Sequence, residues 1–104
     1  MHARIARYSF TGSADEIVQR VTEGMVPILQ SSRGFKEYAV IEAGDELISF
    51  SAWETADAAE MANAAIATWV ADALPDRVEL KEKQIGEIHI STALGVGAKA
   101  RATV

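Results

Sequence analysis

The chain has 104 residues, a length that corresponds to one domain with a modest core. It contains no cysteine, which excludes disulfides, thiolate metal sites and cysteine nucleophiles, and which fits a reducing, cytoplasmic compartment. Fifteen acidic against ten basic residues give a net charge of −5, so we expect no nucleic-acid partner. We also expect no signal peptide in MHARIARYSF and no membrane span, since no apolar run is long enough to cross a bilayer.

The N-terminal segment predicts a strand followed by a helix. Residues 3–10 are rich in side chains that suit a pleated sheet. Ser13 and Glu16 then have the spacing of a capping box, which satisfies backbone groups at the start of a helix. Apolar residues follow at spacings of three, four and seven and form one stripe: Ile17, Val18, Val21, Met25, Ile28 and Leu29. Pro27 removes one backbone hydrogen bond, so we expect a kink before Gly34 ends the helix.

The string GFKEYAVIEAGDELISFSAWE predicts two strands, 35–42 and 47–54, joined by the polar loop 43–46. Thr55 is the expected N-cap of a second helix, which runs to about Leu74. The side chains expected on its inner stripe are Ala58, Ala62, Ala65, Ile66, Trp69, Val70 and Ala73. So many alanines would let this helix lie close to the sheet.

A last strand is expected within residues 79–91, strongest from 84 to 90. The resulting β-α-β-β-α-β order predicts an α+β, ferredoxin-like domain over residues 1–91. Its sheet would have four antiparallel strands, with the first strand between the third and the fourth and both helices on one face. Residues 92–104 are mostly small, with two bases and no aromatics, so alone this tail should be disordered, and we expect a partner subunit to hold it.

The second face of the predicted sheet has no cover within the chain. Whichever alternating set points that way, it carries large side chains: Trp53 or Phe50, Tyr38 or Ile41, Tyr8 or Ile5. Bare, this face would be a large apolar patch, which soluble proteins avoid. We therefore expect a homodimer in which two sheets face each other.

Several segments resemble the antibiotic biosynthesis monooxygenase-like (ABM) family, whose members are dimeric α+β barrels. The similar segments are ARIARYSFTGSADEIVQ, the pair GF, SFSAWETADAAE, WVADALPD and GEIHIS, and together they span residues 1–91. They mark structural positions rather than a reactive group, and the last two look like those of members with no assigned activity. The resemblance implies a pocket between sheet and helices, in which some relatives oxidise phenols or quinols with molecular oxygen and no cofactor.

Other relatives open haem rings and use a histidine on the second helix as the axial ligand. Neither predicted helix contains histidine, so we expect no haem and no other cofactor. His2 and His89 lack a metal-ligand spacing, and we expect no metal, although neighbouring strand ends could bring them together beside Glu87. The cofactor-free relatives use aromatic, asparagine and arginine side chains, for which the candidates here are Arg4, Arg7, Tyr8, Tyr38, Trp53, Asn63 and Trp69.

Most of these candidates also have a plain packing role. Trp53 is a plug at the barrel rim or a wall for substrate, and Trp69 is core or a cavity wall. Asn63 lies about 240° around the helix from Trp69, so the two side chains point in different directions. Asn63 is therefore solvated, or turned inward where its amide could orient a carbonyl or an oxygen intermediate. Tyr8 and Tyr38 are packed, or donate to a substrate oxygen.

Arg4 and Arg7 alternate across the first strand, so one of them should face the open side of the sheet. An arginine on a central strand must be paired or partly wet. Its partner could be Glu82 or Glu87 on the neighbouring strand. The functional alternative is a cation that holds an enolate or a carboxylate.

Two functions from different classes follow. One is a cofactor-independent monooxygenase or isomerase for an aromatic, quinol or polyketide-like compound, in which an enclosed pocket stabilises a carbanion or enolate. The alternative is a non-catalytic homodimer that binds a small apolar ligand or has a structural role only. A cavity of a few hundred cubic ångströms with convergent polar groups favours the enzyme or the binding module, whereas a sealed interior favours the structural one.

Overall fold

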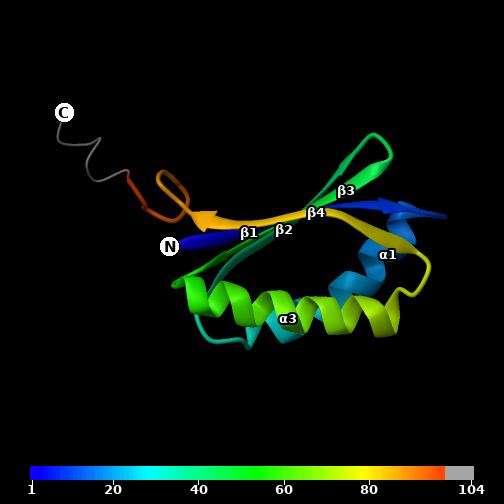
Figure 1. Cartoon of the computed structure of the whole chain (residues 1–104), viewed down its shortest axis with the longest axis horizontal. Coiled ribbons are helices and arrows are strands. Elements are labelled where there is room, and N and C mark those ends of the chain that lie inside the picture. Colours follow the sequence, from blue (N-terminus) through cyan, green and yellow to red (C-terminus); the bar gives the residue numbers. More distant parts are fainter. Residues whose placement is uncertain (98–104) are drawn as a thin grey trace.

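The computed structural model describes residues 1–97. Its helices and strands are β1 (His2–Phe10), α1 (Ala14–Arg20), η1 (Val21–Met25), α2 (Val26–Gln30), β2 (Phe35–Ala43), β3 (Glu46–Trp53), α3 (Ala56–Ala73) and β4 (Val78–Glu87). The four strands form one antiparallel sheet in the order β2-β3-β1-β4. The helices of the described part lie on one side of this sheet (Figure 1). The expected ferredoxin-like fold is confirmed.

Both predicted helix starts are confirmed by their caps. The Glu16 backbone N–H donates to Ser13 Oγ at 3.3 Å, and the Ala58 N–H donates to Thr55 Oγ1 at 3.1 Å. Each hydroxyl satisfies one of the N–H groups that the first turn of a helix leaves without a partner. Local sequence alone therefore determines where both helical runs begin.

The kink expected near Pro27 takes the form of a π-helical turn, η1, just before it. The Val26 N–H donates to the carbonyl of Val21, five residues earlier. Proline has no N–H for an ordinary helical bond and crowds the carbonyl four residues before it, and a wider turn relieves both problems. The buried residues of the whole run recur every four positions: Ile17, Val21, Met25 and Leu29. A regular α-helix would rotate such a stripe by about 40° per step, and the wider turn returns it to the core.

Three residues that were predicted to lie on buried apolar stripes are exposed, so these predictions are wrong. They are Val18 on α1, Ile28 on α2 and Ala65 on α3. The predicted stripes were broader than the faces that the helices bury, because spacings of three and four alone do not locate the centre of a stripe.

The loop between β2 and β3 is shorter than predicted. Ala43 pairs with Glu46, which leaves only Gly44 and Asp45 as the turn. Gly44 has a φ of 64°, a conformation that glycine adopts without steric cost. The strands therefore continue one residue further into the polar segment than its composition indicated.

The prediction that the last strand is strongest from 84 to 90 is wrong, since β4 ends at Glu87. Its neighbour β1 begins at His2, which pairs with Glu87. One further bond joins the Ile88 N–H to the Met1 carbonyl at 2.8 Å. β4 thus ends where its pairing with β1 ends, although the residues up to 90 favour a strand by composition.

Only part of the predicted tail lies within the described residues. Ser91 and Val96 exchange two backbone hydrogen bonds of 2.8 and 2.9 Å and close a short turn. Residues 98–104 lie outside the described residues. The domain boundary at residue 91 and the contact of the tail with a partner subunit stay predictions.

The register decides which of each alternating pair faces the helices. Tyr38, Ser51 and Arg4 form one row across β2, β3 and β1, and this row faces the helices. In the adjacent row Phe50 pairs with Ile5, and these side chains point to the open face.

Trp53 belongs to the core beside that first row. It is fully buried, and its ring meets that of Phe35 edge to face with centroids 5.5 Å apart. Its Nε1–H donates to Ser51 Oγ at 2.9 Å, which satisfies the one polar atom of the side chain. The tryptophan thereby anchors the end of β3 against the helices.

We predict that Gly24→Ala destabilises the protein. In an ordinary helix this change stabilises by about 0.5–1 kcal/mol. Here the new Cβ would lie 2.7 Å from Cζ2 of Trp69, and overpacking of about 1–3 kcal/mol outweighs that gain. Urea denaturation measures the difference. In a Trp69→Leu background the same substitution should cost less, and equal costs in both backgrounds would contradict the contact.

Candidate functional site

A buried arginine on the central strand connects several of the predicted site residues. Arg4 is only 2% exposed. Its Nε–H donates to Asn63 Oδ1 at 2.8 Å and its Nη2–H donates to Tyr8 Oη at 3.0 Å. Nη1 donates over a longer distance, 3.4 Å, to Ser49 Oγ. Side chains from β1, β3 and α3 thus meet at one guanidinium.

The charge of this guanidinium is not balanced by these contacts. All three partners are neutral, and within residues 1–97 Arg4 takes part in no ion pair. Arginine stays protonated in proteins, so it cannot relieve its burial by losing the proton. A buried charge is costly unless an opposite charge accompanies it. The arrangement is therefore suited to an anionic ligand.

A cleft of about 230 Å³ between α3 and β4 reaches this arginine. It is lined by Arg4, Tyr8, Asn63, Ala67, Val70, Ala71, Leu80 and Lys83. Ala67 and Ala71 follow Asn63 by one and two helical turns, so their short side chains leave the space open above it. Both charged lining residues are basic, although the chain as a whole carries −5. The cleft is thus locally positive on an acidic protein.

Tyr38 lies behind the cleft, in the same sheet row as Arg4. Burial raises the pKa of its phenol well above the usual range, and the nearby Tyr8 raises it further, while Arg4 acts in the opposite direction. The Tyr38 hydroxyl therefore stays protonated at neutral pH and keeps a proton to donate.

Four of the seven candidate site residues come together, and three lie elsewhere. Arg4, Tyr8 and Asn63 line the cleft, and Tyr38 lies close to it. Asn63 is turned inward, which was one of its two predicted alternatives. Trp53 lies in the core described above, and Trp69 packs on Gly24 of η1, so neither lines this cleft.

Arg7 is the arginine that points to the open face. It pairs with Glu82 at 3.5 Å, one of the two expected partners, and with Glu46 at 2.6 Å. The Glu46 contact crosses to β3 and was not predicted. This arginine is therefore held by carboxylates, whereas Arg4 is not.

Sequence reasoning missed Ser49 and Lys83. Ser49 lies two residues before Ser51 and on the same face of β3. Lys83 pairs with Ala6, which lies on the same face of β1 as Arg4. Both residues could have been found by asking which side chains of the neighbouring strands β3 and β4 lie on the same face of the sheet as Arg4. That step requires the strand register, which one sequence does not supply.

The histidines do not form a recognisable metal site. His2 pairs in register with Glu87, and its Nδ1 is buried without a hydrogen-bond partner in the described residues. His89 is exposed beyond the end of β4. No three histidine, cysteine or acidic side chains within residues 1–97 lie where they could hold a metal ion. The absence of a metal or cofactor stays a prediction. In the same range, every helix is too short or too polar to pass through a bilayer.

Comparisons with known proteins identify the fold. No protein-family model and no curated protein matches the chain. Among solved structures, SnoaB, a cofactor-independent oxygenase from Streptomyces nogalater, is similar with a TM-score of 0.70 and 16% identity over 88% of this chain and 95% of SnoaB. A candidate antibiotic biosynthesis monooxygenase from Chloroflexus aurantiacus gives 0.65 and 17% over 86% and 94%. A mutant of MhuD, with two manganese protoporphyrin IX molecules bound per active site, gives 0.66 and 14% over 88% and 98%.

The chain thus has the fold of ABM-type antibiotic biosynthesis monooxygenases, as its segments indicated. At these identities the likeness establishes the fold alone. One neighbour is an oxygenase without a cofactor and another binds metalloporphyrin, so the fold does not choose between these chemistries. The choice depends on the side chains of the site.

We predict that the buried phenol of Tyr38 makes the protein sensitive to alkali. Its pKa is raised in the folded state, so its contribution to stability is complete below the unfolded value near 10 and is lost as pH rises above that value. Melting temperatures between pH 9 and pH 12 should therefore fall less steeply for Tyr38→Phe than for the parent. Identical slopes would show that this phenol ionises as freely in the folded as in the unfolded chain.

Proposed function

We propose that this protein is a cofactor-independent monooxygenase that binds an aromatic, quinol or polyketide-like compound as its enolate or phenolate in the cleft over Arg4. The observation that carries the proposal is the buried, uncompensated guanidinium at the floor of a cleft lined by no carboxylate. An enolate supplies the missing charge, and charge-assisted hydrogen bonds are the strong ones. The similarity to a cofactor-independent oxygenase supports the same class.

The reaction balances without a cofactor or an external reductant. A ring methylene and one molecule of dioxygen give a ring carbonyl and one water, and the four electrons that the carbon loses are those that dioxygen gains. Loss of one C–H proton first gives the enolate. Its carbon then bonds to dioxygen to form a peroxide. Loss of the second C–H proton forms the carbonyl, breaks the O–O bond and releases hydroxide, which a proton converts to water.

The residues of the cleft have defined roles in this scheme. Arg4 stabilises the enolate oxygen, which lowers the pKa of the substrate and favours its ionised form. Asn63 holds Nε of Arg4 at 2.8 Å and fixes the direction of the guanidinium. Tyr8 accepts a bond from Arg4, so its own proton remains free to donate to the substrate or to the peroxide.

The alternative function is a non-catalytic homodimeric module that binds a small ligand in the same cleft. Two observations favour it. The cleft, at about 230 Å³, is below the ~300–1,000 Å³ of most small-molecule sites. Its lining also contains no histidine or carboxylate to act as a general base, so only a substrate that ionises readily would react.

We predict that oxygen uptake over a panel of anthrones and quinols depends on Arg4. Arg4→Met should lower kcat/KM by about 10²–10³, because it removes the groups that stabilise the enolate. The kcat/KM of Arg4→Lys should lie between those of the parent and of Arg4→Met, since lysine keeps the charge but lacks the planar fork of donors. Arg20→Met, on the exposed surface of α1, is the matched control.

Circular dichroism establishes that each variant is folded before its rate is compared. Turnover by Arg4→Met at the parent rate would overturn the role of the arginine. If the parent binds these compounds but consumes no oxygen, the non-catalytic alternative holds instead.

The proposal includes a homodimer in the cytoplasm. The open face carries Ile5 and Ile41, which are 47% and 52% exposed, beside Phe50. Within residues 1–97 the helices leave this face uncovered (Figure 1). A second copy placed sheet to sheet would remove these side chains from water.

We predict that Ile5→Asp converts the dimer to monomers, because it buries a carboxylate at the centre of the contact. Met61→Asp is the control, since Met61 is 74% exposed on α3, away from the sheet. Sedimentation equilibrium at micromolar concentration measures both. A monomeric parent chain would refute the dimer directly.

A further inference from the structure

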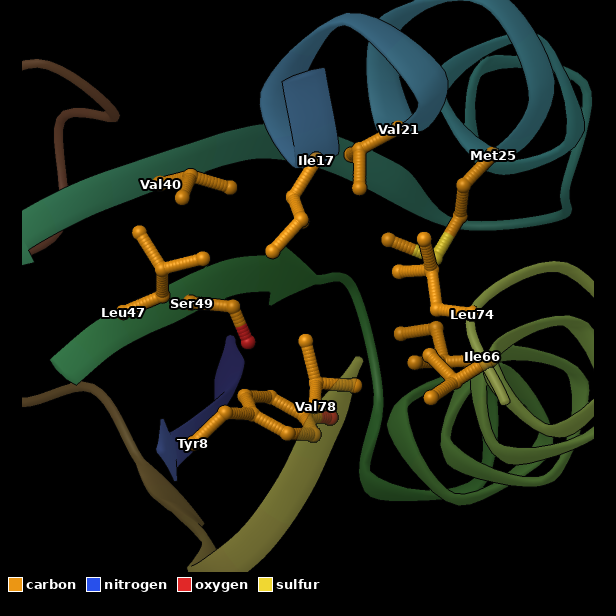
Figure 2. A pocket seen from close by; sticks show the side chains of 11 residues that line it. Tyr8, Ile17, Val21, Met25, Val40, Leu47, Ser49, Ile66, Leu74 and Val78 are labelled. Carbon is orange, nitrogen blue, oxygen red and sulfur yellow. The ribbon is translucent and has the colours of Figure 1, made fainter. Parts of the chain in front are cut away.

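Between the sheet and the helices lies a second, smaller pocket of about 40 Å³, partly open to solvent, which we call the inner cavity. Figure 2 shows Ile17, Val21 and Met25 reaching it from α1 and η1, Ile66 from α3, and Leu74 from just after the end of α3. A single water needs roughly 10–15 Å³ of such space. The cavity can therefore hold a molecule of two or three atoms but not an aromatic ring.

The lining of this inner cavity is almost wholly apolar. Nine of its eleven side chains are aliphatic or methionine, and the other two are Tyr8 and Ser49. The hydroxyl oxygens of these two already accept hydrogen bonds from Arg4. The nine aliphatic and methionine side chains offer a water no hydrogen-bond partner, and apolar space favours apolar guests. The inner cavity is thus suited to a small uncharged gas.

The inner cavity and the cleft are neighbours. Tyr8 and Val70 line both of them, so these two side chains form the partition between the two spaces. The Tyr8 hydroxyl is tied to Arg4 at 3.0 Å, on the side where the anion would bind. The partition therefore separates a positive, polar space from an apolar one.

We propose that the inner cavity is a binding site for dioxygen, which passes Tyr8 and Val70 to reach the anionic substrate in the cleft. The two co-substrates are sorted by polarity, since the anion pairs with Arg4 and the apolar diatomic gas prefers the aliphatic lining. The identity of the gas rests on the proposed function. The affinity of the cavity for dioxygen can be measured without any turnover.

The test uses dissolved dioxygen itself, whose paramagnetism broadens nearby methyl signals in NMR spectra of the intact chain. Under oxygen pressure the methyl signals of Ile17 and Leu47 should broaden more than those of exposed side chains. Val40→Ile should abolish this excess, because Val40 lines the inner cavity but not the cleft, and the added methylene fills the space. Val18→Ile adds the same methylene on the exposed surface of α1 and should leave the broadening unchanged.

In steady-state oxidation, Val40→Ile should raise the KM for dioxygen several-fold and leave kcat and the KM for the organic substrate unchanged. The proposal is overturned if cavity methyls broaden no more than exposed ones, if folded Val40→Ile broadens like the parent, or if its KM for dioxygen is unaltered. If no organic compound is oxidised, the proposed function fails, and the broadening experiment still decides whether the cavity binds the gas.

Discussion

A permanently charged guanidinium in the interior constrains the structure around it. Arg4 lies on the central strand, and its three hydrogen bonds hold Asn63, Tyr8 and Ser49 in place. None of these partners carries a negative charge, so the solvation that Arg4 loses on burial is only partly replaced. An anion in the adjacent cleft would complete the set. This costly feature of the fold is therefore also the one that best accounts for a binding site.

The shape of the interior follows from two local features of the helices. Along α3, the short side chains of Ala67 and Ala71 leave space beside Arg4 and so open the cleft. In the first helical run, the π turn before Pro27 keeps a four-residue stripe directed at the core and brings aliphatic side chains around the inner cavity. Polar and apolar space thus lie next to each other, divided by Tyr8. Such a division suits a reaction between an anion and an apolar gas.

The solved structures with this fold show how little the backbone decides. A cofactor-independent oxygenase and a protein that binds manganese protoporphyrin share it with this chain at 16% and 14% identity. Function on such a scaffold depends on the few side chains that meet in the pocket. Here neither helical run contains histidine, and the convergent groups are Arg4, Asn63 and Tyr8. These groups suit stabilisation of an anion better than ligation of a metal.

The sequence by itself determined the order of the elements, the caps at Ser13 and Thr55 and the disturbance near Pro27, because each depends on neighbours along the chain. It also predicted that one sheet face needs a cover, since both alternating sets are apolar or aromatic. Only the tertiary structure decided that Arg4 and not Arg7 faces the helices, that Asn63 turns inward, and that β4 ends at its pairing with His2. A one-residue shift in strand pairing reverses every side chain, and register is set by contacts between strands distant in sequence.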